Sequence, residues 1–260
     1  MAKLLAAVLA VVLVALAAGA TGMPSEIDDG MPLIHMLRPL LHSGGHLGRR
    51  GGVPCDSWRF AVETNTLRDW ETVPARCEKY VGNYMLGGHY RSDSRAVVDE
   101  AIAYAEGLKL SGEGKEVWVF DVDETTLSNL PYYAQHGFGS EPYNSTAFGA
   151  YAKEANAPAL PETLRLSFIK PVILTGRRED KRESTAKNLA AAGYTGYEKL
   201  LLKPQDVRVT SVEFKSGERK KLVDAGYVIV GNIGDQWTDL LGEPEGDRTF
   251  KLPDPMYYVG

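Results

Sequence analysis

The sequence predicts an α/β fold in which a parallel sheet is flanked by helices. From Glu116 onward, short apolar runs rich in β-branched and aromatic residues recur, and helical segments separate them. The composition is that of a folded globular domain, because 44% of the 260 residues are hydrophobic and 24% are charged. Strands that alternate with helices favour a parallel sheet with both faces covered, whose chemistry lies at the carboxyl ends of the strands.

The charge and composition exclude several other classes of protein. The formal net charge is -5, and the longest Lys/Arg run is Arg49-Arg50, so the electrostatic footprint of a nucleic-acid-binding protein is missing. Ordinary globular composition also argues against a disordered chain, a coiled coil or a polytopic membrane protein. We therefore expect a soluble domain without a nucleic-acid partner.

The first twenty residues have the pattern of a secretory signal peptide. Lys3 precedes an unbroken apolar run over 4–18, and Ala18-Gly19-Ala20 has the small-x-small pattern of a cleavage site. An N-terminal membrane anchor is the alternative, but the run is shorter than the roughly 20 residues that span a bilayer. Residues 1–20 are expected to be removed, which leaves no stable membrane anchor.

A secretory route changes how the cysteines and one asparagine are interpreted. Cys55 and Cys77 can pair across 21 intervening residues, which would stabilise the fold by roughly 3 kcal/mol, and two buried free thiols are the alternative. Asn144 begins the sequence's N-x-[ST] sequon, Asn144-Ser145-Thr146, and either carries a glycan or remains unmodified.

Residues 21–53 are predicted to be a linker or arm of low order, because glycine and proline recur there without a period. His35, His42 and His46 fall in this stretch, and solvated loop histidines are favoured over a metal site. An N-terminal helical extension follows over 55–110. Its three helices are expected to start at Asp56 or Ser57, at Pro74, and at Ser92 or Ser94, and the last two to end near Gly87 and Leu108.

The core strands and helices come next. The predicted strands are 117–120, 172–174, 200–202, 227–230 and 249–252. The clearest helices are 179–192 and 215–225, and each is followed by a glycine that suits a helix end.

Two carboxylates directly follow the first predicted strand. Asp121 and Asp123 are one residue apart, and an apolar interior tolerates such charges only when they are paired or bound to a metal. Mg²⁺ would suit them, because it takes oxygen ligands and keeps waters that a phosphate can displace. A solvated acidic turn is the alternative for this pair taken alone.

Groups that can hold phosphate follow the next strand. Thr175 and Gly176 offer a hydroxyl and an approachable backbone N–H, a combination that holds an anionic oxygen. Lys215, at the start of its predicted helix, supplies a cation that could neutralise phosphate and restrain a carboxylate. Lys203 also follows a strand and is the alternative to Lys215.

A second carboxylate pair follows the fourth strand. Asp235 and Asp239 are four residues apart, which suits one cation on one side of a helix start or, alternatively, helix capping.

In chain order, D-x-D-x-T, T-G-R, Lys and G-D-x-x-x-D resemble the haloacid dehalogenase (HAD) superfamily of aspartate-nucleophile phosphohydrolases. Residues 58–65, 232–237 and 251–258 are similar to the plant branch of class B-type acid phosphatases, which includes the vegetative storage proteins. The resemblance covers about 53–260, essentially the expected mature domain of 54–260. It implies a Rossmann-like HAD fold with a small helical cap inserted after the first core strand.

The resemblance also implies a role for each motif residue. Asp121 would attack phosphorus, and Asp123 would protonate the leaving alkoxide and then activate water. Thr175 and Lys215 would hold the phosphoryl oxygens. The implied Mg²⁺ ligands are the Asp121 carboxylate, the Asp123 main-chain carbonyl and Asp235, with support from Asp239.

Two segments depart from or extend this pattern. Related chains run a longer helix before the strand that precedes T-G-R, whereas here Ser167-Phe168 passes almost directly into Ile169, and this strains the covering helix. The tyrosine-rich insertion over 128–161 is either a cap over the site or a surface helical hairpin with tyrosines packed on the core.

Two functions of different class follow. The first is a secreted or vacuolar Mg²⁺-dependent acid phosphatase that acts on small phosphomonoesters, located outside the cell, in the cell wall or in the vacuole. The second is a vegetative storage protein with little or no catalysis. The presence of Asp121 favours the enzyme, since storage members can lose that aspartate. A homodimer is left open.

Overall fold

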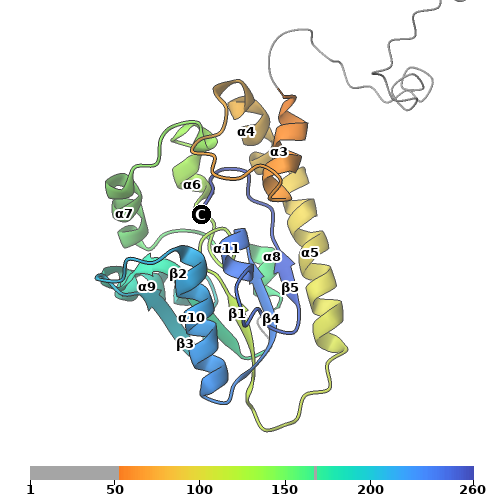
Figure 1. The fold of residues 1–260 in the computed structure, drawn as a ribbon. Helices are drawn as coiled ribbons and strands as arrows, with labels where there is room; N and C mark the ends of the chain where they lie inside the picture. The colour runs from red at the N-terminus through yellow and green to blue at the C-terminus, as the bar shows by residue number, and fades with distance from the viewer. Residues whose placement is uncertain (1–52, 167–168) are drawn as a thin grey trace, which may run out of the picture. The chain divides into compact units, whose positions relative to one another are not determined.

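Five parallel strands form one sheet in the computed structural model, in the order β3-β2-β1-β4-β5 (Figure 1). Their bounds are β1 Glu116–Phe120, β2 Pro171–Arg178, β3 Lys199–Lys203, β4 Val228–Gly234 and β5 Thr249–Lys251. The predicted α/β fold is confirmed. The structure describes residues 53–166 and 169–260, so the predicted signal peptide and the histidines of the arm lie outside the described residues.

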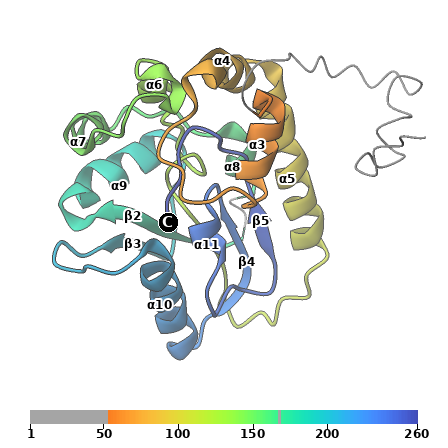
Figure 2. The ribbon, with the colours of Figure 1, turned by 45° about the horizontal axis from the view of Figure 1, so that its top comes forward.

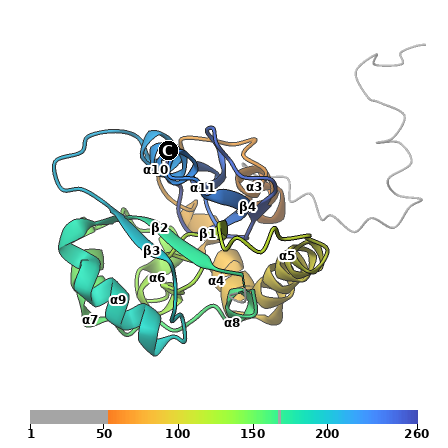
Figure 3. The ribbon, with the colours of Figure 1, turned by 90° about the horizontal axis from the view of Figure 1, so that it is seen from below.

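The sheet buries both faces, as the apolar strands predict. Side chains of β1 alternate between two layers, with Val117 and Val119 on one face and Trp118 and Phe120 on the other. Helix α10 (Ser211–Asp224) packs on the first face, whereas α9 (Arg182–Ala191) and α8 (Pro161–Leu164) lie on the opposite side (Figure 3). Ser211, at the start of α10, and Lys181, just before α9, line the candidate site at the carboxyl edge of the sheet.

The N-terminal extension holds α3 Cys55–Glu63, η1 Ala75–Cys77, α4 Glu78–Leu86 and α5 Gly88–Glu106 (Figure 2). The predicted disulfide between Cys55 and Cys77 is confirmed, and it ties the start of α3 to η1.

Two predicted helix starts in this extension are wrong. The first helix has Pro54 at its N-cap rather than Asp56 or Ser57. The third begins at Gly88, because the hydroxyls of Ser92 and Ser94 donate to carbonyls four residues earlier, at 2.8 Å each, instead of capping a helix.

The connection between β1 and β2 contains α6 Leu130–Tyr133, η2 Gly137–Gly139, α7 Ser145–Glu154 and the four-residue α8. Despite this short crossover, β2 stays in parallel register with β1, and Phe120 lies opposite Ile173. The buried Glu162 of α8 accepts hydrogen bonds from Arg91 of α5 at 2.7 and 2.9 Å, so the long α5 anchors the short helix.

Two further boundaries differ from the sequence prediction. Helix α10 begins at Ser211, because Thr210 and Glu213 form a capping box, so Lys215 lies in its second turn rather than at its start. Strand β2 continues through Thr175 and Gly176 to Arg178, with an irregularity in its pairing with β3 between Thr175 and Arg178. No helix within 53–166 or 169–260 is long and apolar enough to cross a membrane.

Candidate active site

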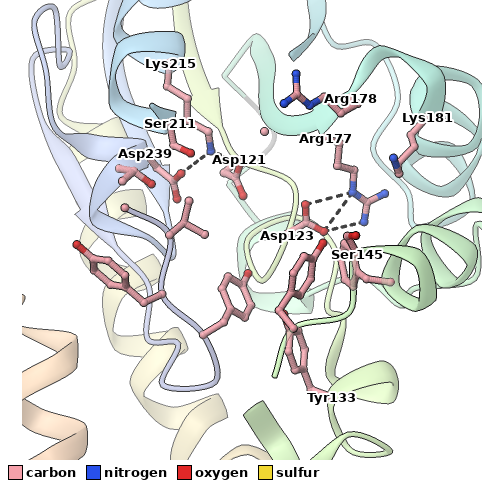
Figure 4. A pocket seen from close by; sticks show the side chains of 18 of the residues that line it. Asp121, Asp123, Tyr133, Ser145, Arg177, Arg178, Lys181, Ser211, Lys215 and Asp239 are labelled. Carbon is pink, nitrogen blue, oxygen red and sulfur yellow. Dashed lines mark hydrogen bonds and ion pairs between the residues drawn. The ribbon is translucent and has the colours of Figure 1, made fainter. Parts of the chain in front are cut away.

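The chemistry-bearing residues gather at the carboxyl edge of the sheet, as a parallel sheet requires. A cavity of about 620 Å³ opens there (Figure 4). The residues that line it come from the loop between α3 and η1, the strand ends, the β1–β2 insertion, the segment before α9, α10, α11 (Trp237–Leu240) and the C-terminal segment 257–260: Glu71, Asp121, Asp123, Tyr133, Tyr143, Ser145, Phe148, Gly176, Arg177, Arg178, Lys181, Ser211, Lys215, Thr238, Asp239, Tyr257, Tyr258, Val259 and Gly260.

Asp121 lies at the wall of this cavity in an ion pair with Lys215. The Lys215 Nζ is 2.6 Å from Asp121 Oδ1, and it also contacts Asp239 Oδ1. Burial raises the pKa of Asp121 well above its ordinary value; Lys215 opposes this shift and Asp239 adds to it. Burial alone would lower the pKa of Lys215, but the two carboxylates outweigh it and raise that pKa. Lys215 is therefore a buried cation held against the carboxylate predicted to be the nucleophile.

Lys203, the alternative cation, lies elsewhere. Its Nζ donates to the main-chain carbonyl of Val209 at 2.5 Å, and the residue is not among those that line the cavity. The structure thus places Lys215, rather than Lys203, beside Asp121.

Carboxylate oxygens of Asp121, Asp235 and Asp239 lie within 4.8 Å of one another, and all three residues are buried. Oxygens that coordinate one Mg²⁺ ion lie within roughly 4.2 Å of each other, so the spacing is close to that of a single coordination sphere. Burial also raises the pKa of Asp235, and Asp239 and Glu124 add to the shift. The ammonium of Lys215 contacts Asp121 and Asp239, which leaves three carboxylates beside one cation. The ionised set therefore has an excess of negative charge, and a divalent cation fits it.

Asp235 and Asp239, the pair that follows β4, each have hydrogen-bond partners of their own. Asp239 accepts a hydrogen bond from the backbone N–H of Gln236 at 2.9 Å, which caps α11, so the capping alternative applies to this residue as well. A Cβ atom at Gly234 would overlap the Asp239 side chain, so only glycine lets this carboxylate reach the set. Asp235 accepts hydrogen bonds from Thr125 at 3.2 Å and Gln236 Nε2 at 2.9 Å.

Asp123 has different surroundings although it is only two residues from Asp121. The guanidinium of Arg177 donates to both of its oxygens at 2.7–3.1 Å, and Asn129 Nδ2 donates at 2.7 Å. Burial pushes the pKa of Asp123 upward, but Arg177 outweighs burial and lowers the pKa below its ordinary value. We call Asp123, Arg177 and Asn129 the arginine clamp.

The phosphate-binding residues predicted after β2 lie at this edge in different environments. Thr175 is fully buried, and its Oγ1 accepts a hydrogen bond from the Arg177 backbone N–H at 3.1 Å. Gly176 is exposed and lines the cavity, and nothing lies within 4 Å of the position that a Cβ atom would occupy there. The open backbone next to the cavity is therefore at Gly176.

Sequence reasoning assigned no role to Glu124, Asn129, Arg177 or Tyr257. Asn129, Arg177 and Tyr257 contact predicted residues, and Glu124 contacts Asn129 and Tyr257. Glu124 is fully buried with a φ of 50°, and burial raises its pKa to about 8, with a further increase from Asp123. The Tyr257 hydroxyl lies 2.9 Å from Glu124 Oε2 and 3.1 Å from Asp235 Oδ2. A signal existed for three of them, since Glu124, Arg177 and Tyr257 lie in or next to the motifs that carry the resemblance.

The insertion between β1 and β2 has features of both predicted alternatives. Tyr132 and Tyr133 of α6 are buried in an aromatic cluster with Phe148 and Tyr151, as expected for a hairpin packed on the core. Tyr133 and Phe148 also line the cavity, as expected for a cap. Asn144, the predicted glycan site, is exposed and caps α7 by accepting from two backbone N–H groups at 3.0 and 3.1 Å.

The fold and the site can be compared with known proteins. Residues 46–260 match the family model of the HAD superfamily, subfamily IIIB (acid phosphatase). Acid phosphatase 1 of Solanum lycopersicum is 44% identical over 230 residues, which cover 85% of this chain and 90% of that protein. Vegetative storage protein 1 of Arabidopsis thaliana is 45% identical over 216 residues, covering 79% of this chain and 78% of the relative.

Two further comparisons extend these matches. The stem 28 kDa glycoprotein of Glycine max is 46% identical over 231 residues, with 85% of this chain and 90% of the relative covered. Among solved structures, the class C acid phosphatase from Bacillus anthracis superposes with a TM-score of 0.58 at 20% identity, over 71% of this chain and 86% of that chain. At that identity the superposition supports the fold alone.

Proposed function

The chain belongs to the HAD superfamily, subfamily IIIB, the acid phosphatase family, and from this membership we propose that it hydrolyses small phosphomonoesters with the help of Mg²⁺. The observation that carries the proposal is the placement of Asp121. This carboxylate lies at the cavity wall, 2.6 Å from the Lys215 ammonium and within 4.8 Å of the oxygens of Asp235 and Asp239. A nucleophile, a phosphate-neutralising cation and a metal-binding set therefore meet at one point.

The reaction would proceed in two displacements. In the first, the Asp121 carboxylate attacks phosphorus, the bond from phosphorus to the ester oxygen breaks, and Asp123 gives its proton to the leaving alkoxide. In the second, Asp123 takes a proton from water, the resulting hydroxide attacks the aspartyl-phosphate, and Asp121 is released with inorganic phosphate. Asp123 lines the same cavity, so both carboxylates can reach one substrate.

The remaining groups would manage charge. Lys215 and the open backbone at Gly176 would face the phosphoryl oxygens, and the Thr175 hydroxyl would support this strand end from the buried side. Mg²⁺, held by Asp121, Asp235 and the Asp123 main-chain carbonyl with support from Asp239, would neutralise the negative charge that the phosphate brings to this set. Arg177 would orient Asp123 and favour its carboxylate form, which is the form that activates water.

The test is hydrolysis of para-nitrophenyl phosphate by the folded chain with and without Mg²⁺. We expect turnover that requires Mg²⁺ and that falls by roughly 10³-fold or more in Asp121→Asn. The matched control is Asp99→Asn on α5, which breaks an exposed ion pair with Arg165 and should retain full activity. Turnover that persists in Asp121→Asn would contradict the proposal.

A storage role is the second candidate, since the relatives at about 45% identity include proteins named vegetative storage protein. A chain that folds and binds Mg²⁺ but does not hydrolyse the ester would favour it. For either role we propose a secretory route, with residues 1–20 as the signal peptide and a glycan on the exposed Asn144. The Cys55–Cys77 disulfide supports an oxidising compartment, and mass spectrometry of the secreted chain would test the cleavage and the glycan.

A further inference from the structure

A series of hydrogen-bonding contacts links Asp235, of the metal-binding set, to Asp123 through residues outside the predicted site. Tyr257 contacts Asp235 at 3.1 Å and Glu124 at 2.9 Å. Asn129 Nδ2 then lies 3.0 Å from Glu124 and 2.7 Å from Asp123. The series therefore runs from a carboxylate of the metal-binding set to the arginine clamp.

Tyr257 is held firmly although it belongs to the C-terminal segment. Its ring stacks on Tyr133 of α6, with ring centroids 5.2 Å apart and an interplanar angle of 20°. Directly after its side chain the backbone is tied to Gln236, which donates to the Tyr257 carbonyl at 3.4 Å and accepts from the Val259 N–H at 3.1 Å. The phenol hydroxyl is thus fixed at one position between two carboxylates.

Donors are scarce along this series. A phenol has one proton, so Tyr257 can donate to only one of its two carboxylate neighbours at a time. Both Nδ2 hydrogens of Asn129 are directed to carboxylates, and its buried Oδ1 has no hydrogen-bond partner among the described residues. Loss of the Tyr257 hydroxyl would remove one hydrogen bond from the buried carboxylates, and Asp235 would then be held only by its remaining contacts with Thr125 and Gln236.

We propose that Tyr257 is a positioning residue, which holds the metal-binding carboxylate of Asp235 and, through Glu124 and Asn129, the orientation of Asp123. This inference rests on the proposed metal-assisted function of the same site. Outer hydrogen-bond partners of metal ligands typically account for a 10–100-fold effect on metal affinity. Removal of the Tyr257 hydroxyl should therefore weaken Mg²⁺ binding by roughly 10-fold or more.

The experiment is a calorimetric titration of MgCl₂ into the full chain, in the wild type, Tyr257→Phe and Tyr84→Phe. The control removes a hydroxyl that donates to Asp93 at 2.8 Å between α4 and α5, away from the cavity. We expect the Kd for Mg²⁺ to rise roughly 10-fold in Tyr257→Phe and to stay within about twofold in Tyr84→Phe. At saturating Mg²⁺, KM for para-nitrophenyl phosphate should be unchanged in Tyr257→Phe while kcat stays lowered, because Asp123 is less well oriented.

A second variant tests the inference if Tyr257→Phe folds poorly. Tyr133→Leu keeps the Tyr257 hydroxyl but removes the ring on which it stacks, and it should raise the Kd by a smaller factor. An unchanged Kd in both variants would overturn the proposal, as would a wild type that does not bind Mg²⁺. A wild type that binds Mg²⁺ without hydrolysing the ester would refute the proposed phosphatase but leave the Kd comparison decisive for Tyr257.

Discussion

Asp121 and Asp123 follow the same strand, yet the two sides of the site around them differ. Asp121 lies in an acidic set with Asp235 and Asp239, where Lys215 contacts two of the three carboxylates and the pKa of Asp121 is raised. Asp123 lies in the arginine clamp, where its pKa is lowered. In Figure 4 the two carboxylates lie on opposite sides of the loop that follows β1.

Topology explains this difference. Strand β1 lies between β2 and β4 in the sheet, so each carboxylate meets the end of a different neighbour. β4 leads into Asp235 and Asp239, whereas β2 carries Arg177. A central strand can therefore supply two adjacent carboxylates with opposite electrostatic environments, which suits one for metal binding and attack and the other for proton transfer.

The largest expected effect comes from breaking the clamp. Arg177→Met removes a guanidinium whose side chain is 2% exposed and leaves Asp123 without its counter-charge. We expect the free energy of unfolding to fall by about 3–5 kcal/mol, measured by urea denaturation. Arg165→Met breaks an exposed pair with Asp99 and should cost no more than about 1 kcal/mol. Equal losses of unfolding free energy in the two variants would show that the buried clamp stabilises the fold no more than an exposed ion pair does.

Catalysis at the acidic set of Asp121, Asp235 and Asp239 should depend on Lys215. Lys215→Met should lower kcat by roughly 10²–10³-fold, because a preorganised cation that faces the phosphoryl group is lost. Lys203→Met, which removes a side chain bound to the Val209 carbonyl, should leave kcat nearly unchanged. A comparable loss of kcat in Lys203→Met would show that the phosphate-binding role does not belong to Lys215 alone.

Mg²⁺ should stabilise the fold through the acidic set and not through the clamp. At 100 times its Kd, a ligand that binds only the native state stabilises it by about 2.7 kcal/mol, which a Tm measurement detects. This stabilisation should persist in Asp123→Asn, which keeps the main-chain carbonyl, and should be lost in Asp235→Asn. Stabilisation retained in Asp235→Asn would place the ion elsewhere.

The smallest expected effect concerns pH. The clamp lowers the pKa of Asp123, so its protonated form, which the leaving alkoxide needs, is scarce near neutral pH and becomes more abundant as the pH falls. The rate with an alkyl phosphate should therefore rise relative to that with para-nitrophenyl phosphate, by up to about tenfold per pH unit between pH 7 and 5. A ratio that does not change with pH would show that Asp123 is not the proton donor.

Much of the fold was predictable, because strand periodicity and chain order decide it. The five strands and the two helices α9 and α10 follow from apolar runs and glycine ends, and the disulfide follows from two cysteines in a chain predicted to be secreted. Helix starts were less predictable, since Ser92 and Ser94 bond within α5 whereas Thr210 caps α10. Serine and threonine serve both purposes, and only the tertiary structure decides between them.

The site was predictable in its members but not in their partners. Parallel strand ends bring Asp121 and Asp235 to the same edge of the sheet, and α10 adds Lys215 there. Arg177, which clamps Asp123, lies in the stretch where the pairing of β2 with β3 is irregular, and no sequence spacing reveals that irregularity. Tyr257 lies 133 residues from Glu124 along the chain, and only the folded path of the C-terminal segment joins them.

The division of roles between Asp121 and Asp123 is tested most directly by trapping the intermediate. Asp123→Asn, mixed with Mg²⁺ and para-nitrophenyl phosphate and quenched in acid, should accumulate a covalent phosphoryl group, because para-nitrophenolate leaves without a proton whereas water is no longer activated. Mass spectrometry of the digested chain should locate that group on Asp121. Turnover by the wild type without an adduct on Asp121 in the variant, or an adduct on another side chain, would contradict the account.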